Sequence, residues 1–164
     1  MNIKKKLETY LYENLETKEK SFGLYKSKRL YNMTEEYCTS ESNINNYINE
    51  NKDENTFQTK LFYYIDSKNL KDSDVYNKVS IDRRLFSKIR SNKDYHPSKE
   101  TIILLAIALE LTEDELEDLL TSASYSLPMN TTYDLIIRFC FKEKIYNLNQ
   151  INEFLYDHNC KVLN

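Results

Sequence analysis

Glycine is nearly absent from this sequence. Its 164 residues include one glycine, two prolines and no tryptophan. Phosphate-binding loops need several glycines in a short stretch, because only glycine lets the backbone approach a phosphate so closely. Dinucleotide-binding and P-loop motifs are therefore excluded. Tight hairpin turns also favour glycine, so the same shortage disfavours a protein built from strands.

Paired cysteines and long apolar runs are lacking as well. Cys38, Cys140 and Cys160 are widely spaced, which predicts neither a disulfide framework nor a structural zinc site. No apolar run approaches the roughly 18 residues that a membrane helix needs. Glutamates, and not an apolar stretch, follow the basic residues 4–6, so the N-terminus does not resemble a signal peptide. We expect a cytoplasmic protein with reduced thiols and without a cofactor, a metal or a membrane contact.

Charge is distributed unevenly along the chain. The net charge is −3, but residues 57–100 carry ten Lys or Arg against six Asp or Glu, whereas residues 101–164 carry four against ten. A local basic excess is typical of a surface that binds nucleic acid, while the overall acidity lowers that expectation. Hydrophobic residues make up 40% of the chain. That share is typical of a globular protein with a real core.

Apolar side chains recur at helical spacing along most of the chain, which predicts an all-α protein. We expect an amphipathic helix over about residues 4–17 and a short helix near 44–48, while residues 18–40 fit either a short hairpin or an irregular loop. The polar run 49–55 is typical of a linker. These features make residues 1–55 an N-terminal helical arm.

The helical pattern is sharper after the linker. Residues 56–122 predict five helices in the order long, short, short, long, short. The eight consecutive apolar residues 102–109 place the fourth of these helices at the centre of the core. Two further helices, at about 132–142 and 148–156, make residues 123–164 a C-terminal extension packed on this module.

Capping residues mark the expected helix ends. Thr56, Ser98 and Thr112 are placed to cap helices, the last within a capping box. Asp82 is better explained as a cap than as a base-reading residue. Asn92 stands where a left-handed helix stop is expected, since asparagine tolerates that conformation best after glycine.

Several motifs agree in their offsets along this helical region. They are Ile81-Asp-Arg-Arg-Leu-Phe-Ser-Lys-Ile-Arg-Ser-Asn92, Pro97-Ser98, Leu105-Ala-Ile-Ala-Leu109 and the capping box at Thr112. Together they resemble the lambda-repressor-like (XRE) helix-turn-helix family. The resemblance implies a five-helix bundle over residues 56–122, with Ile81 and Phe86 as core anchors of the recognition helix. The stretch from Asp82 to Leu120 also looks like uncharacterised helix-turn-helix proteins of Firmicutes, some of which carry this region behind a macro domain.

This sequence departs from the family's pattern around the second helix of the module. Tyr76 stands where a small residue is usual, so it must widen the helix contacts or point outward. Ser80 stands where the turn usually has glycine. Asp72 and Asp74 lie where members of the family approach phosphate, and carboxylates there repel it.

The resemblance implies a non-enzymatic, sequence-specific DNA-binding regulator that acts as a homodimer on double-stranded DNA. We expect Arg83 and Arg84 to face the major groove, where arginine pairs bidentately with guanine. Lys88 and Lys93 would meet phosphates. A solvated basic face, or salt bridges to the acidic C-terminal part, explains the same charges without DNA. The full set of expected DNA-binding residues is Arg83, Arg84, Ser87, Lys88, Arg90 and Lys93.

No catalytic arrangement is visible in the sequence. His96 and His158 have no carboxylate or cysteine partner at ligand spacing and are expected to be ordinary surface histidines. The alternative function is therefore not an enzyme but a protein-interaction module, such as a phage- or mobile-element-encoded inhibitor or adaptor. Such a protein would keep the helix-turn-helix fold without reading DNA. It would hold its partner through the Tyr-rich arm, because tyrosine supplies contact area at little entropic cost.

Overall fold

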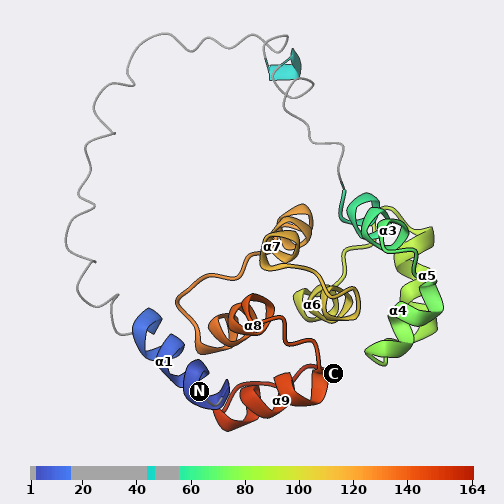
Figure 1. The fold of residues 1–164 in the computed structure, drawn as a ribbon. Helices are drawn as coiled ribbons and strands as arrows, with labels where there is room; N and C mark the ends of the chain where they lie inside the picture. Colours follow the sequence, from blue (N-terminus) through green and yellow to red (C-terminus); the bar gives the residue numbers. More distant parts are fainter. Residues whose placement is uncertain (1–2, 16–43, 47–55) are drawn as a thin grey trace, which may run out of the picture. The chain divides into compact units, whose positions relative to one another are not determined.

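The computed structural model describes residues 3–15, 44–46 and 56–164 of this protein. Over these residues the chain is helical, without a strand, which confirms the all-α prediction (Figure 1). All seven helices expected beyond residue 56 are present, and residues 44–46 are helical. The predictions for residues 18–40 and 49–55 lie outside the described residues. The helices are α1 (Ile3–Leu15), α3 (Phe57–Ser67), α4 (Asp72–Lys78), α5 (Arg83–Ser91), α6 (Lys99–Ala108), α7 (Glu113–Ser122), α8 (Thr132–Lys142) and α9 (Leu148–Asp157).

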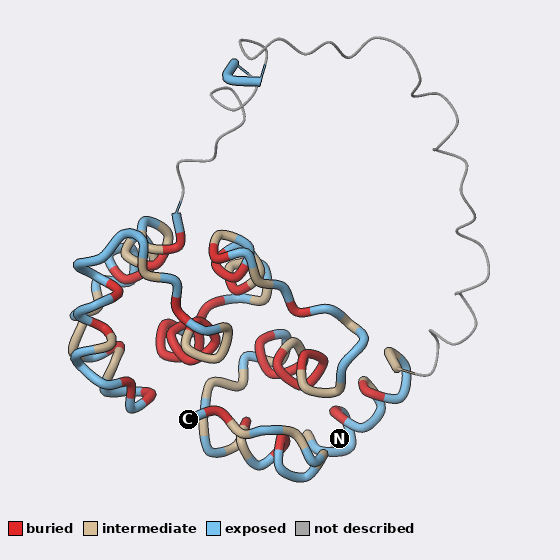
Figure 2. The backbone as a smooth tube through the Cα atoms, turned by 180° about the vertical axis from the view of Figure 1, so that it is seen from behind, coloured by how far each residue is buried: buried red, intermediate tan, exposed pale blue. Residues whose placement is uncertain are grey.

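Helix α6 is the centre of the core, as the run 102–109 predicts. Every residue of that run is at most 2% exposed, and Figure 2 shows the helix buried along most of its length. α6 contacts α4 on one side and α7 on another. A helix that is apolar all round is stable only when neighbours cover it on several sides, and these contacts supply that cover.

The N-terminal helix belongs to the same compact unit as the C-terminal helices. α1 packs against α8, and residues 3–15 cluster with residues 56–164. Leu7 and Leu11 on α1 are buried in this contact. The helix expected in a separate arm therefore completes the C-terminal part of the fold. Helical periodicity indicated an apolar face on α1 but gave no information on which helix would cover it.

Six of the seven helices from α3 to α9 end in a left-handed residue that is not glycine. After each, the next backbone N–H donates to the carbonyl five residues earlier, as Ile81 N–H does to Tyr76 at 2.9 Å. This is the Schellman arrangement, in which an apolar residue after the left-handed position packs back on the helix. The left-handed residues are Asn69, Ser80, Glu110, Ser124, Lys144 and Asn159, with φ between 50° and 58°.

Helix α5 is the exception, and the predicted left-handed stop at Asn92 is wrong. Asn92 is extended, with φ −113° and ψ 105°. The side-chain amide of Gln58 on α3 donates to the carbonyls of Ile89 at 2.9 Å and Arg90 at 2.5 Å. Because the last carbonyls of α5 find a donor on α3, the chain needs no left-handed turn to satisfy them.

The longest of these helices, α1, has 13 residues. In the described part of the chain, no helix combines the length and the apolar character that a membrane span requires.

Candidate nucleic-acid interface

Helices α4 and α5 are consecutive and joined by the short turn 79–82. Ser80 in this turn has φ 55°, the left-handed conformation that glycine adopts most easily. Asp82 caps α5, and its Oδ1 accepts the Arg84 N–H at 2.6 Å, which confirms the cap prediction. The turn therefore keeps a glycine-type geometry with serine.

Helix α5 has one buried face and one exposed face. Phe86 and Ile89 are at most 2% exposed and join the core. The residues expected to contact DNA all lie on the exposed side or in the turn that follows it. They are Arg83, Arg84, Ser87, Lys88, Arg90 and Lys93.

Tyr76 on α4 is half-buried and does not point away from the protein. Its ring packs on the Phe86 ring, with the centroids 5.6 Å apart. The ring of Phe62 meets Phe86 edge-on at 6.3 Å. The rings of Phe62 on α3 and Tyr76 on α4 thus pack against Phe86 on α5. The large residue on α4 therefore contributes to packing at the edge of the core.

Arg90 is held by contacts within the protein. Its guanidinium lies over the ring of Phe62 at 4.1 Å and pairs with the carboxylate of Asp72 at 2.6 Å. Together with the bonds from Gln58 to the end of α5, these contacts join α5 to α3 and α4. The roles of Gln58 and Phe62 could not be predicted from the sequence, since both lie about thirty residues from α5 and no local spacing relates them to it.

The other basic side chains on α5 and just after it differ in whether they contact the rest of the protein. The Lys88 ammonium lies 4.3 Å from the centre of the Tyr95 ring, a cation–π contact. Within the described ranges, Arg83, Arg84 and Lys93 form no ion pair and no ring contact. The unengaged arginines therefore lie in the first turn of α5, and the engaged cations lie toward its end.

Three other basic residues of the 57–100 window pair with the acidic part of the chain. Lys60 pairs with Asp118 at 2.5 Å, and Lys78 pairs with Glu110 at 2.5 Å. Lys99 pairs with an acidic residue of α8, described below. Salt bridges to the acidic C-terminal part thus account for these three lysines of the basic window. They do not account for Arg83 and Arg84.

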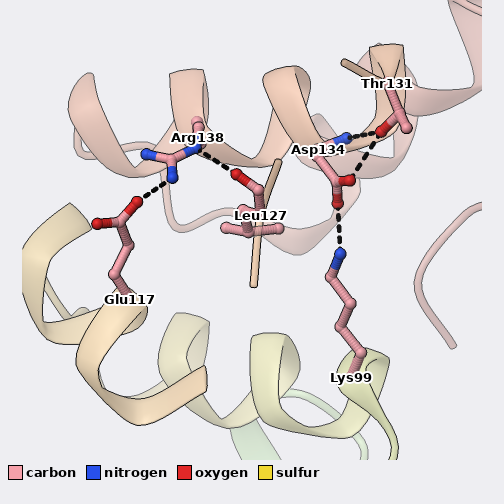
Figure 3. Close-up of polar contacts among 6 residues, drawn as sticks. All are labelled: Lys99, Glu117, Leu127, Thr131, Asp134 and Arg138. Carbon is pink, nitrogen blue, oxygen red and sulfur yellow. Dashed lines mark hydrogen bonds and ion pairs between the residues drawn. The ribbon is translucent and has the colours of Figure 1, made fainter. Parts of the chain in front are cut away.

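The most buried carboxylate of the described chain is structural. Asp134 is 4% exposed and pairs with the Lys99 ammonium at 2.6 Å (Figure 3). Its other carboxylate oxygen accepts from the Thr131 hydroxyl at 2.8 Å, and its N–H donates to that hydroxyl at 3.1 Å. A buried charge is stable only when it is paired and hydrogen-bonded, and these contacts meet that need while joining α6 to α8.

Arg138 joins α8 to α7 in a similar way. Its Nε donates to the carbonyl of Leu127 at 2.8 Å, and its guanidinium pairs with Glu117 (Figure 3). The guanidinium also pairs with Glu113 at 2.7 Å. Burial lowers the pKa of Arg138, but the two carboxylates outweigh this effect and raise it above its usual value. Acidic residues of the segment 101–164 therefore form ion pairs that join helices within the protein.

A groove of about 360 Å³ separates α4 from the exposed side of α5. Arg83, Ser87 and Arg90 line it from α5, at the i, i+4 and i+7 positions of one helix stripe. Lys71, Asp72, Ser73 and Tyr76 line it from the α4 side. The groove is open and polar, and it presents cations and hydroxyls beside a single carboxylate.

Candidate metal ligands do not cluster in the described part of the chain. No three His, Cys, Asp or Glu side chains lie together there as a metal site would require. A ring nitrogen of His96 bonds with the carbonyl of Ala123 at 2.7 Å, and one of His158 with that of Phe154 at 2.8 Å. His96 thus contacts the residue that follows α7, and His158 bonds to its own helix, α9.

Comparison with known proteins finds no relative for this chain. No family model matches it, and neither a curated protein nor a solved structure shows significant similarity to it. The resemblance to the lambda-repressor-like family therefore stays a prediction.

Proposed function

We propose that this protein is a cytoplasmic, non-enzymatic DNA-binding regulator with a lambda-repressor-like helix-turn-helix, in which α5 is the recognition helix. One observation carries the proposal. Arg83 and Arg84 are exposed in the first turn of α5 without an acidic partner in the described chain, whereas Lys60, Lys78 and Lys99 of the same basic window are neutralised.

The position of these arginines suits base recognition. In helix-turn-helix proteins the N-terminal residues of the recognition helix meet base edges in the major groove. Arginine there pairs with guanine O6 and N7. Ser87, one turn further along, offers a hydroxyl on the same stripe as Arg83. Lys88 and Lys93, at the far end of α5 and just beyond it, are placed for phosphates.

A homodimer on a two-fold site follows from the same proposal. A single α5 covers few base pairs, and dimers of this class gain affinity by occupying half-sites about 10 base pairs apart or a multiple of that. Footprints of the full chain on a selected site should therefore show this spacing.

The test is a gel shift with the full chain and a random 30-base-pair duplex at 50 and 200 mM salt, followed by selection of bound sequences. Binding that falls steeply with salt, together with an enriched motif, supports the proposal. The double variant Arg83→Ala/Arg84→Ala should lose the motif. The control Lys5→Ala/Lys68→Ala removes the same charge from exposed lysines outside α5 and should keep it. Selection that enriches no motif contradicts the proposal.

A second function, the protein-interaction module, is favoured by a different surface. Tyr63 on α3 is 66% exposed and meets the Tyr64 ring edge-on at 5.7 Å. Both line a hollow of about 360 Å³ between α3 and α7, with Lys60 and Asp118 on its walls. Exposed tyrosine beside a hollow is typical of protein interfaces. If the wild-type chain leaves DNA unbound, Tyr63→Ala is the first variant to examine for loss of a partner.

A further inference from the structure

Asp72 and Arg90 face each other across the groove between α4 and α5. The Arg90 Nη2 lies 2.6 Å from the Asp72 Oδ1, and the guanidinium rests on the Phe62 ring. Arg90 lies on the same side of α5 as Arg83 and Ser87. Its charge is therefore part of the surface that faces DNA in the proposed function.

We infer that Asp72 is a positioning residue that withdraws Arg90 from phosphate binding, so that DNA binding depends on the first turn of α5. This inference rests on the proposed function. A free arginine on this stripe would neutralise a phosphate on any sequence and would raise non-specific binding. With Asp72 in place, the guanidinium is neutralised and fixed before DNA arrives.

The contact is better suited to this role than to stabilising the fold. The Arg90 side chain is 51% exposed and the Asp72 side chain 34% exposed, and ion pairs with this much solvent contact stabilise proteins little. α5 is independently fastened by Gln58 and by the buried Phe86 and Ile89. Removal of the Asp72 carboxylate should therefore leave α5 in place and leave the guanidinium charge without its ion pair, beside the Phe62 ring alone.

The ion pair with Arg90 also explains how the acidic residue Asp72 is compatible with DNA binding at the start of α4. An unpaired carboxylate there would repel phosphate. Paired with Arg90, it contributes almost no net charge to the groove. Lys71 and Arg83 are the other charged groups that line the groove, and both are basic.

The experiment measures the salt dependence of binding to a fluorescein-labelled random 30-base-pair duplex, using the full chain. Asp72→Asn keeps the size of the side chain and frees Arg90. One additional phosphate contact steepens the slope of log K against log salt by about 0.9. Affinity for random DNA should therefore rise roughly fifteenfold at 50 mM salt and roughly fourfold at 200 mM. Preference for the selected motif over random DNA should fall.

Asp74→Asn is the matched control. It removes the same charge from the same helix, but Asp74 pairs with no arginine in the described chain. Its carboxylate accepts hydrogen bonds from the Lys71 N–H at 3.4 Å and from the Ser73 hydroxyl at 3.3 Å. Its salt slope should equal that of the wild type. The double variant Asp72→Asn/Arg90→Gln should also return to the wild-type slope, because the released cation is gone.

The outcomes separate this inference from the proposed function. Equal slopes for Asp72→Asn and Asp74→Asn, in a wild type that binds DNA, overturn the role of Asp72 and leave the proposed function intact. Binding by Asp72→Asn alone supports the role of Asp72 and contradicts DNA binding by the native chain. Absence of salt-dependent binding in every variant overturns both.

Discussion

The ring of Tyr10 on α1 lies against the ring of Phe139 on α8, with centroids 5.4 Å apart and 48° between the ring planes. Leu7 and Leu11, one turn before Tyr10 and directly after it, are buried in the same contact. Ion pairs join α1 to α9 as well, from Lys4 to Glu153 at 2.6 Å and to Asp157 at 3.1 Å. The first helix of the chain is thus part of the C-terminal core.

Shortening a buried side chain of α1 should destabilise the whole unit. Leu7 is 1% exposed, so Leu7→Ala leaves a cavity and should lower the free energy of unfolding by about 2–5 kcal/mol. Urea unfolding followed by circular dichroism measures this loss. Glu8→Ala, on the exposed side of the same turn, should stay within about 0.5 kcal/mol of wild type. Equal midpoints for the two variants would show that α1 does not contribute to the core.

The centre of α6 should not accept a charge. Leu105 is 0% exposed, and Leu105→Asp places a carboxylate in an apolar interior at a cost of several kcal/mol, even after its pKa rises. We expect this variant to be unfolded at room temperature. Leu105→Ala, with an expected loss of about 2–5 kcal/mol, gives a measurable value in urea. A native melting temperature for Leu105→Asp would contradict the burial of α6.

Replacing Ser80 with glycine should stabilise the protein. Ser80 has φ 55°, which costs a residue with a side chain roughly 1–2 kcal/mol and costs glycine much less. Ser80→Gly should therefore raise the unfolding free energy by about 0.5–1 kcal/mol, after the extra freedom that glycine adds to the unfolded chain. Ser73→Gly, inside α4, is the opposite control and should destabilise, because glycine is a poor helix former. A lower melting temperature for Ser80→Gly would refute the explanation.

The cations of α5 should affect DNA binding in two different ways. Arg83→Ala should cost ~1–3 kcal/mol at the preferred site and relax sequence choice there. Lys88→Ala should weaken binding to all sequences about equally and lower the salt slope by roughly one charge. Fluorescence anisotropy on specific and random duplexes separates the two effects. If both variants behave as wild type, α5 is not the DNA-binding surface.

The thiol of Cys140 should be inert in the folded protein. Burial raises its pKa from the ordinary 9.0 to about 12, so almost no reactive thiolate exists at pH 8. We expect mass spectrometry after iodoacetamide treatment to find Cys140 unmodified in buffer and modified in 6 M guanidinium. Cys160, whose pKa burial also raises, is only half-buried and should react sooner. Rapid labelling of native Cys140 would contradict its place in the core.

Local features of the sequence were sufficient to predict the helices of the second part of the chain. The caps at Thr56, Ser98 and Thr112 and the apolar run 102–109 act within a few residues, so their signal is complete in a short window. The cap at Asp82 was predictable for the same reason.

Contacts between distant residues could not be predicted in this way. The stop at Asn92 was predicted wrongly because Gln58, on another helix, satisfies the end of α5. The exposed face of α5 was predictable from its spacing. The pairing of Asp72 with Arg90 was not, since it depends on how α4 packs beside α5.

The contact between α1 and α8 also constrains the order of events during synthesis. A ribosome makes Leu7 and Tyr10 long before Phe139, by on the order of ten seconds at ordinary rates of synthesis. The apolar side of α1 has no α8 to cover it until then. During that interval, α1 can meet the same surface on α8 of a neighbouring chain whose own first helix has not yet packed. The contact that completes one molecule therefore also provides a route by which two nascent chains exchange their first helices.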